Sequence, residues 1–586
     1  MSINSGFSIG RTGLSASQVG LQVSGNNISN ANSVGYTRQR LDLSPLQDQA
    51  QLGLRLGTGV ATQAVRRLTD RALQQRAWNA TSSQAASDTA YEQLRSLETL
   101  LNPLGDTDTS TPELDGPNLS SQFTNYFNAW SSLSSHPTDA ASRSSVVTAG
   151  RNLASTLRDT RSAVVSQQTS IDTDLNNSIA RANTLLTEIA HVNSQIVTSG
   201  GQASSGLLDR RDQLVSELSS LVNITVNEQP SGSADVLVGS MPLVLGVNAS
   251  PMTLRARTDP STGETVTEIV AGSQNETLGI SGGRIGALLT ARRQGYQAII
   301  NKIDAMAAQV IYQTNRAYST GASGTAQTSF TGSRASTSPS LALNDPTNST
   351  FANLGYQPTS GQIVVEVMTN GSRQRTTINI DLDGITNAGT AGYADDTSPA
   401  SLATALSGIP NLTATIDAAG RLQIDAAPGS SVRFVDDTSG VLATLGVNSY
   451  FTGTNAVDID VNASLVTDPL TLNTSNISGT NTQDNGVAMA MAALRDTANS
   501  ALGGATFGGY WDAATQTVSA DANNAKTQSQ ATGAVKESLD NQLVALTGVN
   551  LDEEAINLVQ YQSMYQASAR FISLLQDVSQ TLLQMV

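Results

Sequence analysis

The stretch from Arg151 to Ser199 contains neither glycine nor proline. Apolar or small residues recur seven apart along it, at Leu175, Ala182, Ile189 and Ile196. A helix over this stretch would be roughly 70 Å long, at about 1.5 Å per residue. Because a helix of this kind is not stable alone, it needs a long antiparallel partner. Candidate partners lie at Val60–Leu101, Ile285–Tyr318 and residues 515–546.

Both ends of the chain carry similar periodic stripes. Near the N-terminus the large apolar residues are seven apart, at Phe7, Leu14, Leu21 and Ile28. From Leu551 to Val586 a second apolar stretch runs without glycine or proline and includes Leu558, Tyr565, Ile572, Leu575, Val578 and Leu582. Sustained heptads predict coiled-coil packing, so we expect these residues to form subunit interfaces. The alternative is a pair of helices buried within a monomer.

Two segments lack helical periodicity and alternate like strands. The first runs from Ile224 to Ile280, and the second covers about residues 325–475. The second contains Asn370-Gly371 between alternating apolar residues, which is a strong hairpin signal. The order helix, strands, helix, strands, helix predicts a mainly α chain with β insertions, a multidomain α+β protein. It would combine terminal coiled-coil helices, a long helical-bundle rod body and strand-rich outer domains.

A chain of 586 residues is too long for one hydrophobic core. The expected domains are an N-terminal axial helix with an extended segment (1–59), a helical rod body (60–222), a β-rich outer segment (223–282), a return helix of the rod (283–324), a β-rich variable outer domain (325–475), the C-terminal part of the rod (476–546) and a C-terminal axial helix (547–586) that pairs with 1–59.

Composition narrows the class of protein. Charged residues make up 14%, against about 25% in ordinary soluble proteins, which suits side-by-side packing of identical subunits. The net charge of −16 argues against nucleic acid and anionic membrane as partners. The chain has no cysteine, no basic and apolar leader at its start and no long apolar run, so we expect no membrane insertion and, if the protein is secreted, another export route.

Candidate catalytic and metal-ligating residues are few. We therefore expect no enzymatic activity, no cofactor and no metal site. A Ser-His-Asp triad would need His136 or His191, and His191 follows Glu188 on the predicted long helix. Residues 379–384 resemble the first half of an EF-hand loop, but Thr390 stands where the loop needs glutamate. A strand running into an Asp-Gly turn is the better interpretation. The charged run Asp209–Asp212 is either a recognition patch or a helix-start cluster.

Three motifs resemble a known family. The block Asn26–Tyr36, with Asn27, Asn30, Asn32, Gly35 and Tyr36, is similar to the N-terminal signature of bacterial flagellar rod, hook and hook-associated proteins. The C-terminal residues Gly548–Glu554, Leu558–Tyr561 and Tyr565–Arg570 resemble the family of flagellar hook-associated protein 1, the hook–filament junction protein. The interior residues Leu207–Thr225, with Asp209, Arg211 and Asp212, match the same family, whereas 325–475 departs most from it.

The resemblance implies a structural subunit in a ring between hook and filament. It implies as partners the subunit itself, the hook protein and the next hook-associated protein toward the filament. It also implies type III export to an extracellular flagellum, with a chaperone at the C-terminal region. One alternative is another flagellar axial subunit, such as a hook protein or a flagellin-like protein, which the Asp209–Asn223 motif disfavours. The other is a secreted adhesin or surface enzyme.

Overall fold

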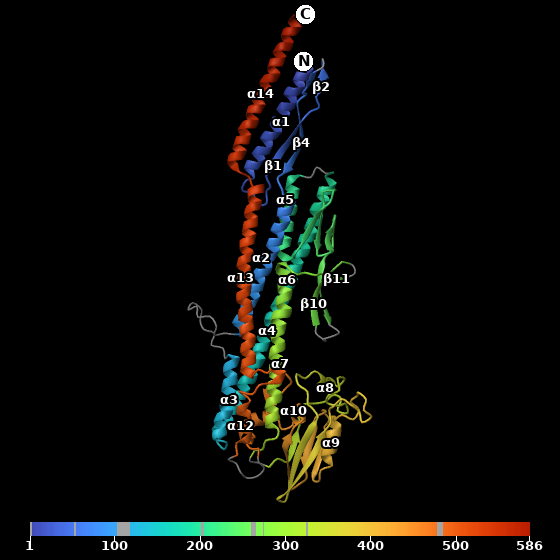
Figure 1. The fold of residues 1–586 in the computed structure, drawn as a ribbon, viewed down its shortest axis with the longest axis vertical. Coiled ribbons are helices and arrows are strands. Elements are labelled where there is room, and N and C mark those ends of the chain that lie inside the picture. Colours follow the sequence, from blue (N-terminus) through green and yellow to red (C-terminus); the bar gives the residue numbers. More distant parts are fainter. Residues whose placement is uncertain are drawn as a thin grey trace. The chain divides into compact units, whose positions relative to one another are not determined.

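The computed structural model describes residues 3–51, 54–101, 118–200, 204–258, 265–272, 275–323, 326–476 and 484–585 (Figure 1). The chain divides into two compact units, each built from segments far apart in the sequence. The first unit comprises residues 1–92, 172–291 and 523–586, and the second comprises 93–171 and 292–522. Helices predominate, and strands occur as insertions between them, which confirms the predicted fold class. No helix in the described ranges is long and apolar enough to cross a membrane.

The helices of the first unit are α1 (Ile3–Ser29), α5 (Ser205–Leu221), α6 (Gly283–Thr290), α14 (Leu551–Gln584) and parts of α2 (Arg71–Leu101), α4 (Ala140–Thr198) and α13 (Phe507–Thr547). Its strands are β1 (Gln39–Pro45), β2 (Gln49–Gln51), β3 (Leu54–Leu56), β4 (Val60–Arg67), β5 (Thr225–Glu228), β6 (Ala234–Val238), β7 (Met241–Leu245), β8 (Asn248–Ala249), β9 (Met252–Thr258), β10 (Thr265–Ala271) and β11 (Glu276–Thr277). They form the antiparallel sheets β1-β4, β2-β3, β5-β6-β7-β8 and β11-β10-β9.

The prediction of a helix beginning at Val60 is wrong. Residues Val60–Arg67 form strand β4, which pairs with β1 so that Val65 lies opposite Leu41. The helix begins only at Arg71, where the Asp70 carboxylate accepts hydrogen bonds from the backbone N–H groups of Ala72 and Leu73. The absence of glycine and proline permits a helix but does not require one, and pairing with β1 decided this segment.

The long helix α4 is longer than expected, because Gly150 does not end it. A side chain at Gly150 would collide with the hydroxyl group of Tyr450. Glycine at this position of the helix therefore allows Tyr450 to pack closely against α4. Of the predicted partners, α7 (Gln297–Tyr318) contacts α4 through an ion pair between Arg161 and Asp304, 2.8 Å long. In the first unit α4 instead meets α5, through Arg181–Glu217 and Arg210–Glu188.

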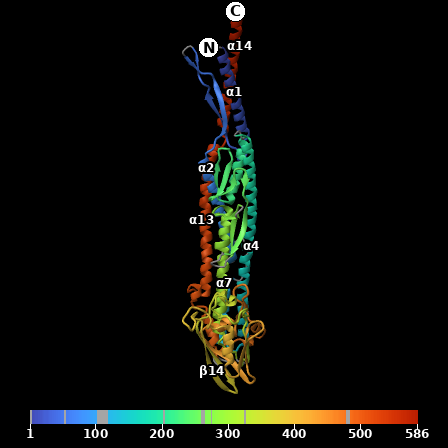
Figure 2. The same cartoon turned by 90° about the vertical axis from the view of Figure 1, so that its right-hand side faces the viewer.

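The other helices of the second unit are α3 (Leu119–Ser135), the π-helix η1 (Ala291–Tyr296), α8 (Ser349–Ala352), α9 (Pro399–Ser407), α10 (Val441–Leu445), α11 (Ala463–Thr467), α12 (Gly486–Ala493) and the 3₁₀ turns η2 (Pro469–Thr471) and η3 (Ser500–Leu502). The strands are β12 (Ser329–Thr331), β13 (Gly361–Thr369), β14 (Ser372–Ile380), β15 (Leu412–Ile416), β16 (Leu422–Ala426), β17 (Ser430–Asp437), β18 (Phe451–Thr452) and β19 (Asp460–Val461). Figure 2 shows the same elements from the side.

The expected hairpins are present in the second unit. Strands β13 and β14 pair through the Asn370-Gly371 turn, where both residues have positive φ (48° and 81°), as a type I′ turn requires. The sheets run in the orders β14-β13-β17 and β12-β16-β15. One apolar core, which includes Phe330, Val365 and Phe434, lies among these strands and the helices α9 and α10. Elsewhere in this unit Trp130, Tyr126, Tyr318, Tyr450 and Phe451 form a fully buried aromatic cluster.

Candidate functional site

The two terminal helices lie antiparallel, and small residues on α1 set their separation. A Cβ atom built on Gly6 would lie 2.9 Å from Leu575 Cδ1, on Gly13 2.9 Å from Ser568 Oγ, and on Gly20 2.5 Å from Tyr561 Cδ1. Each step of seven along α1 therefore matches a step of seven back along α14. A side chain on Gly10 or Gly20 would overlap Ile572 or the Tyr561 ring, so the helix backbones approach closely along a glycine face (Gly6, Gly10, Gly13 and Gly20).

The predicted large apolar stripe of α1 is only partly buried. Phe7, Leu14, Leu21 and Ile28 are all half-buried, whereas the neighbouring small residues Gly10, Ala16, Ser17, Gly20 and Ser24 are buried. On α14 the predicted residues divide into two groups. Ile572 and Leu575 are half-buried against Gly10 and Gly6, and Leu558 is also half-buried. Tyr565, Val578 and Leu582 are exposed.

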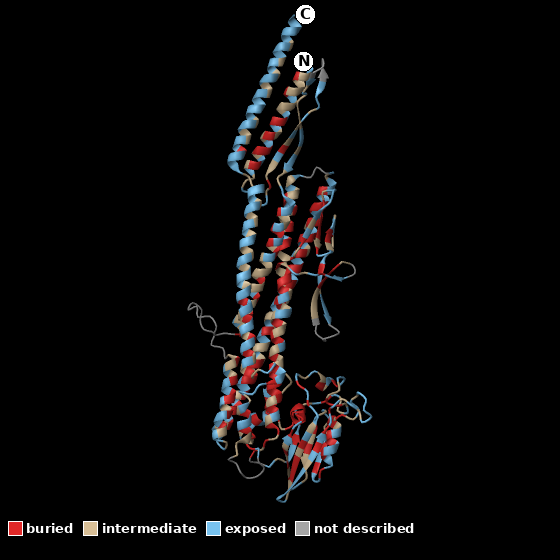
Figure 3. Ribbon diagram, in the orientation of Figure 1, coloured by how far each residue is buried: buried red, intermediate tan, exposed pale blue. Residues whose placement is uncertain are grey.

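One apolar stripe of α14 is open to solvent. Its members recur three or four residues apart, and we call them the α14 stripe: Phe571 (38% exposed), Leu574 (60%), Val578 (43%), Leu582 (49%) and Met585 (79%). Figure 3 shows α14 as mostly exposed along its length, in contrast to α1. Past Ile3, the first described residue of α1, α14 continues without a helical partner (Figure 1). Exposed contiguous apolar surface of this kind is typical of an interaction site.

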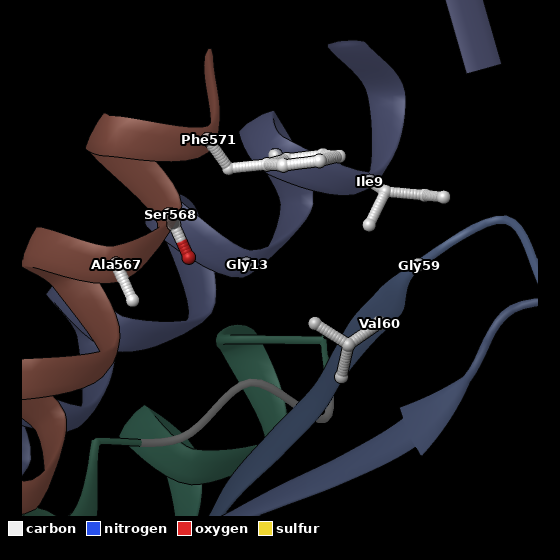
Figure 4. A pocket seen from close by; sticks show the side chains of 8 residues that line it. Ile9, Gly13, Gly59, Val60, Ala567, Ser568 and Phe571 are labelled. Carbon is white, nitrogen blue, oxygen red and sulfur yellow. The ribbon is translucent and has the colours of Figure 1, made fainter. Parts of the chain in front are cut away.

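A hollow of about 360 Å³ lies beside this stripe. Figure 4 shows it between α1, α14 and the start of β4, with Phe571 reaching across α1 toward Ile9 and Val60 below. Its lining consists of apolar and small residues: Ile9, Gly10, Gly13, Gly59, Val60, Ala567, Ser568 and Phe571. The strand is tied to α1 here, because the Val60 N–H donates to Thr12 Oγ1 at 3.3 Å. Such a lining can receive an apolar side chain but offers no acid, base or metal ligand.

The turn that follows α1 is fixed by Asn27, which is fully buried. Its side chain pairs with the backbone of Gln39: Asn27 Nδ2 donates to the Gln39 carbonyl oxygen at 2.9 Å, and the Gln39 N–H donates to Asn27 Oδ1 at 3.0 Å. The Tyr36 hydroxyl donates to the same oxygen at 2.8 Å. Burial, together with the negative charges of Asp209 and Glu554, raises the pKa of Tyr36 to about 12.

Arg38 joins this turn to the start of α14. Its guanidinium forms ion pairs with Glu553 and Glu554, each 2.7 Å long, and its backbone N–H donates to the carbonyl oxygen of Thr547, the last residue of α13, at 2.8 Å. Glu554 is 2% exposed, so Arg38 neutralises a buried carboxylate, and removing one partner of such a pair is costly. Asn550 caps α14, and its side-chain oxygen accepts hydrogen bonds from the backbone N–H groups of Asp552 and Glu553.

The interior motif of α5 meets the same turn. Asp209 pairs with Arg67 Nε at 3.1 Å and accepts weakly from the Thr37 N–H at 3.5 Å; Asp212 also pairs with Arg67. Burial raises the pKa of Asp209, although Thr37 and Arg67 oppose this rise. Arg211 is 2% exposed, pairs with Glu228 and donates to the Gly232 carbonyl oxygen at 2.8 Å. We call the set Asn27, Tyr36, Arg38, Asp209 and Glu554 the joint.

The structure brings most of the predicted motif residues together at this joint. Gly35 has φ 79° and lies against Gln213, which donates to the Val34 carbonyl oxygen at 2.9 Å. The run Asp209–Asp212 is thus neither an exposed patch nor a simple helix-start cluster, because Asp209 and Arg211 are buried in internal ion pairs. The Asn30 side chain bonds to its sequence neighbours Asn26 and Ser33, and Asn32 and Arg570 are exposed.

Sequence reasoning missed the ion pairs of Arg38, Arg67 and Glu554. The small residues Gly10, Ser17 and Ser24 indicated a face of α1 that allows close approach, but Gly6, Gly13 and Gly20 were not recognised as part of it. Glycines three, four and seven apart within an apolar stretch were the available signal for the glycine face. The ion pairs had no comparable signal, because their partners come from distant segments. Both histidines are exposed, and Glu188 pairs with Arg210 at 2.9 Å.

Comparison with known proteins places these features in a family. Residues 104–330 match the model of the "Flagellar hook-associated protein FlgK helical domain", and residues 542–585 match that of the "Flagellar basal body rod FlgEFG protein C-terminal". The second match spans the end of α13 and α14. The first includes α5 and its interior motif.

Relatives extend the similarity to nearly the whole chain. Flagellar hook-associated protein 1 of Salmonella typhimurium is 26% identical over 580 residues, which is 96% of each chain. The protein of the same name from Bacillus subtilis is 30% identical over 236 residues, or 39% of this chain and 45% of the relative. Among solved structures, that of the flagellar hook junction protein FlgK from Burkholderia pseudomallei is 17% identical, with a TM-score of 0.47, covering 80% of this chain and 99% of that one.

Proposed function

We propose that this chain, which belongs to the family of flagellar hook-associated protein 1, is a structural subunit of the bacterial flagellum at the junction between hook and filament. The relatives of this name from Salmonella and Escherichia coli match 96% of the chain, and a family model matches the end of α13 and α14. The role is mechanical: the terminal helices pack against neighbouring subunits, and the rest of the chain is carried on them. The protein acts outside the cell, as an exported component of the flagellum.

The observation that supports this assembly role is the α14 stripe. Within one chain, α1 covers only one side of α14. Glu554 is the one buried residue between Leu551 and Gln584. The apolar side chains of the α14 stripe lie largely in water, which is unfavourable at about 25 cal/mol per Å² of apolar surface. Packing against helices of other subunits would remove this surface from water. We infer that Tyr565, Val578 and Leu582 contact neighbouring subunits in a ring, whereas Ile572 and Leu575 hold α14 on α1.

The half-buried stripe of α1 is the second part of the proposed interface. Phe7, Leu14, Leu21 and Ile28 each keep part of their side chains exposed after α14 has packed. A second helix could complete their burial, as in a coiled coil. The neighbours would be other copies of this chain, the hook protein on one side and the next hook-associated protein on the other.

Before export, the same α14 stripe would be an aggregation hazard. We infer that a flagellar export chaperone covers it, accepting the helix in an apolar groove. Chaperone binding and assembly would then exclude each other, because both use Leu574, Val578 and Leu582. The chaperone would be released before the subunit enters the ring.

The test is a double variant, Leu574→Asp with Leu582→Asp, in cells that lack the native protein. Both positions are exposed, so the melting curve of the purified variant should not change. Burying an unpaired charge in an assembled helix array costs several kcal/mol, so the cells should make hooks, shed filament protein and not swim. Electron microscopy and a swimming assay give the result.

The matched control is Gln576→Asp with Gln580→Asp, which adds the same charge to exposed positions of the same helix. This variant should assemble and swim. Normal filaments with the Leu574 and Leu582 variant would contradict the proposed interface. Calorimetry with the export chaperone separates the two uses of the stripe: undiminished binding by the leucine variant would place the chaperone site elsewhere.

A further inference from the structure

Three carboxylates converge in the loop between β14 and α9 of the second unit. One side-chain oxygen each from Asp381, Asp383 and Asp396 lies within 4.8 Å of the others. Among the described residues, none of the three forms an ion pair with lysine, arginine or histidine. Like charges this close repel one another, and a bound cation would offset this repulsion.

Asp396 supplies an independent sign of a missing partner. It is 5% exposed, and its Oδ2 accepts from Asn344 Nδ2 at 2.6 Å and from the Gly384 N–H at 3.0 Å. Its Oδ1 is buried and has no hydrogen-bond donor, and neither has the buried Oδ1 of Asn344. A buried polar atom without a partner costs about 1–3 kcal/mol, more for a charged group. Native structures leave few such atoms, and an unseen ion is one common explanation.

The surrounding backbone holds the three carboxylates in place. The Asp381 N–H donates to Thr397 Oγ1 at 3.0 Å, and the Thr397 N–H donates to the Asp381 carbonyl oxygen at 2.7 Å. Asp383 Oδ1 accepts from the Ile385 N–H at 2.8 Å, which leaves its other oxygen available. The two ends of the loop are thereby closed on each other before any ion binds.

We propose that this cluster binds a calcium ion. The donors are all oxygens, and Ca²⁺ takes six to eight oxygen ligands in flexible geometry. Asp381, Asp383 and Asp396 would be the direct ligands, with the Oδ1 of Asn344 as a further oxygen and water completing the shell. Mg²⁺ fits less well, because it demands a near-ideal octahedron and keeps most of its water. The site would stiffen the β14–α9 loop once the chain is outside the cell, where calcium is plentiful.

The partial EF-hand pattern at residues 379–384 runs into this loop, but Thr390, at the last ligand position of that pattern, is not part of the cluster. Thr390, in the position of the EF-hand glutamate, instead hydrogen-bonds Thr386. The third carboxylate comes from Asp396, farther along the chain, and only the fold of the loop brings it back. This is therefore an oxygen cluster of a different kind from an EF-hand.

The experiment compares full-length wild type with Asp383→Asn and with Asp396→Asn, after removal of metals by chelation. Calorimetry with CaCl₂ should give one site per chain on the wild type, with a Kd of about 0.1–1 mM, as in extracellular calcium modules. At a tenfold excess over Kd, calcium should raise the Tm by about 2–4 °C. Both variants should bind at least about tenfold more weakly, and MgCl₂ should bind more weakly than CaCl₂.

The control is Asp436→Asn, at an exposed carboxylate on β17 of the same unit, and it should respond to calcium like the wild type. Terbium gives a second readout, because Tyr393 packs against Gly384, 3.5 Å from where its Cβ would be, and can sensitise Tb³⁺ luminescence. Tyr393→Leu should lose this luminescence and keep calcium binding. No heat and no Tm shift with the wild type, or an equal response in Asp383→Asn and Asp396→Asn, would overturn the proposal.

Discussion

The paired terminal helices and the aromatic cluster of the second unit obtain their stability in opposite ways. In the cluster, Trp130 and Tyr126 are fully buried, and rings from α3, α7 and the β18 segment enclose one another. In the helix pair, α1 presents glycines to α14, and nearly all of α14 remains exposed. The cluster is complete within one chain. The helix pair has buried one side only, and the proposed assembly would bury the other.

The difference shows that one chain can combine a fully buried core with a helix pair that is buried on one side only. Large side chains make a core that tolerates little change, because its packing is already dense. A glycine face lets the two backbones approach closely and leaves many of the large residues of both helices partly or fully exposed. In the proposed assembly, these exposed residues are the surface that neighbouring subunits would cover.

The largest expected effect is in the aromatic cluster. Trp130 contacts Tyr126, Tyr318 and Tyr450, with ring centroids 5.5–6.5 Å away. Trp130→Ala would leave a large cavity and should destabilise the second unit by about 3–5 kcal/mol. Urea unfolding followed by circular dichroism measures this loss. Hydrogen exchange in α1 should not change. If the free energy of unfolding fell by less than about 1 kcal/mol, the cluster would not be a densely packed core.

A smaller effect is expected where the glycine face is disturbed. Gly20→Leu would force a side chain into the ring of Tyr561 and should cost the helix pair about 1–3 kcal/mol. Hydrogen exchange should accelerate in α1 and α14, while the urea transition of the second unit stays in place.

The control for this change is Gly25→Ala, on the same helix. A Cβ atom there would meet nothing within 4 Å, so alanine should slow exchange in α1 by its helix propensity, a gain of about 0.5–1 kcal/mol. Equal behaviour of the two variants would show that α1 and α14 do not approach as closely as the glycine face indicates.

The smallest effect concerns the joint. Tyr36→Phe removes the hydrogen bond to Asn27 and should cost about 1 kcal/mol at pH 8. Because the folded pKa of Tyr36 is about 12, above the unfolded value of about 10, the native tyrosine loses stability as the pH rises from 10 to 12. The advantage of wild type over Tyr36→Phe should therefore shrink across this window. Urea midpoints at pH 8 and 11 measure it, and a constant difference would mean that Tyr36 titrates as if exposed.

Periodicity and turn chemistry in the sequence determined most of the secondary structure. The heptads of the terminal helices, the glycine-free run of α4 and the Asn370-Gly371 turn each carry a local signal, because helix and hairpin geometry depend on neighbouring residues. The family motifs were also readable, and they led to the flagellar assignment. The prediction from sequence was wrong at Val60–Arg67, which pairs with a strand instead of forming a helix. It was also wrong at Gly150, where the helix continues because glycine allows close packing against Tyr450.

Only the tertiary structure decided which faces meet. The glycines of α1 lie against α14, while its leucines stay half-buried, because backbone separation sets that contact. The Arg38–Glu554 and Arg67–Asp209 pairs each join residues more than a hundred positions apart in the sequence. No local sequence pattern encodes such a partner. The same holds for Asp396, which joins Asp381 and Asp383 only after the loop closes. Charges and close approaches act through space, so their partners are fixed by the fold rather than by spacing along the chain.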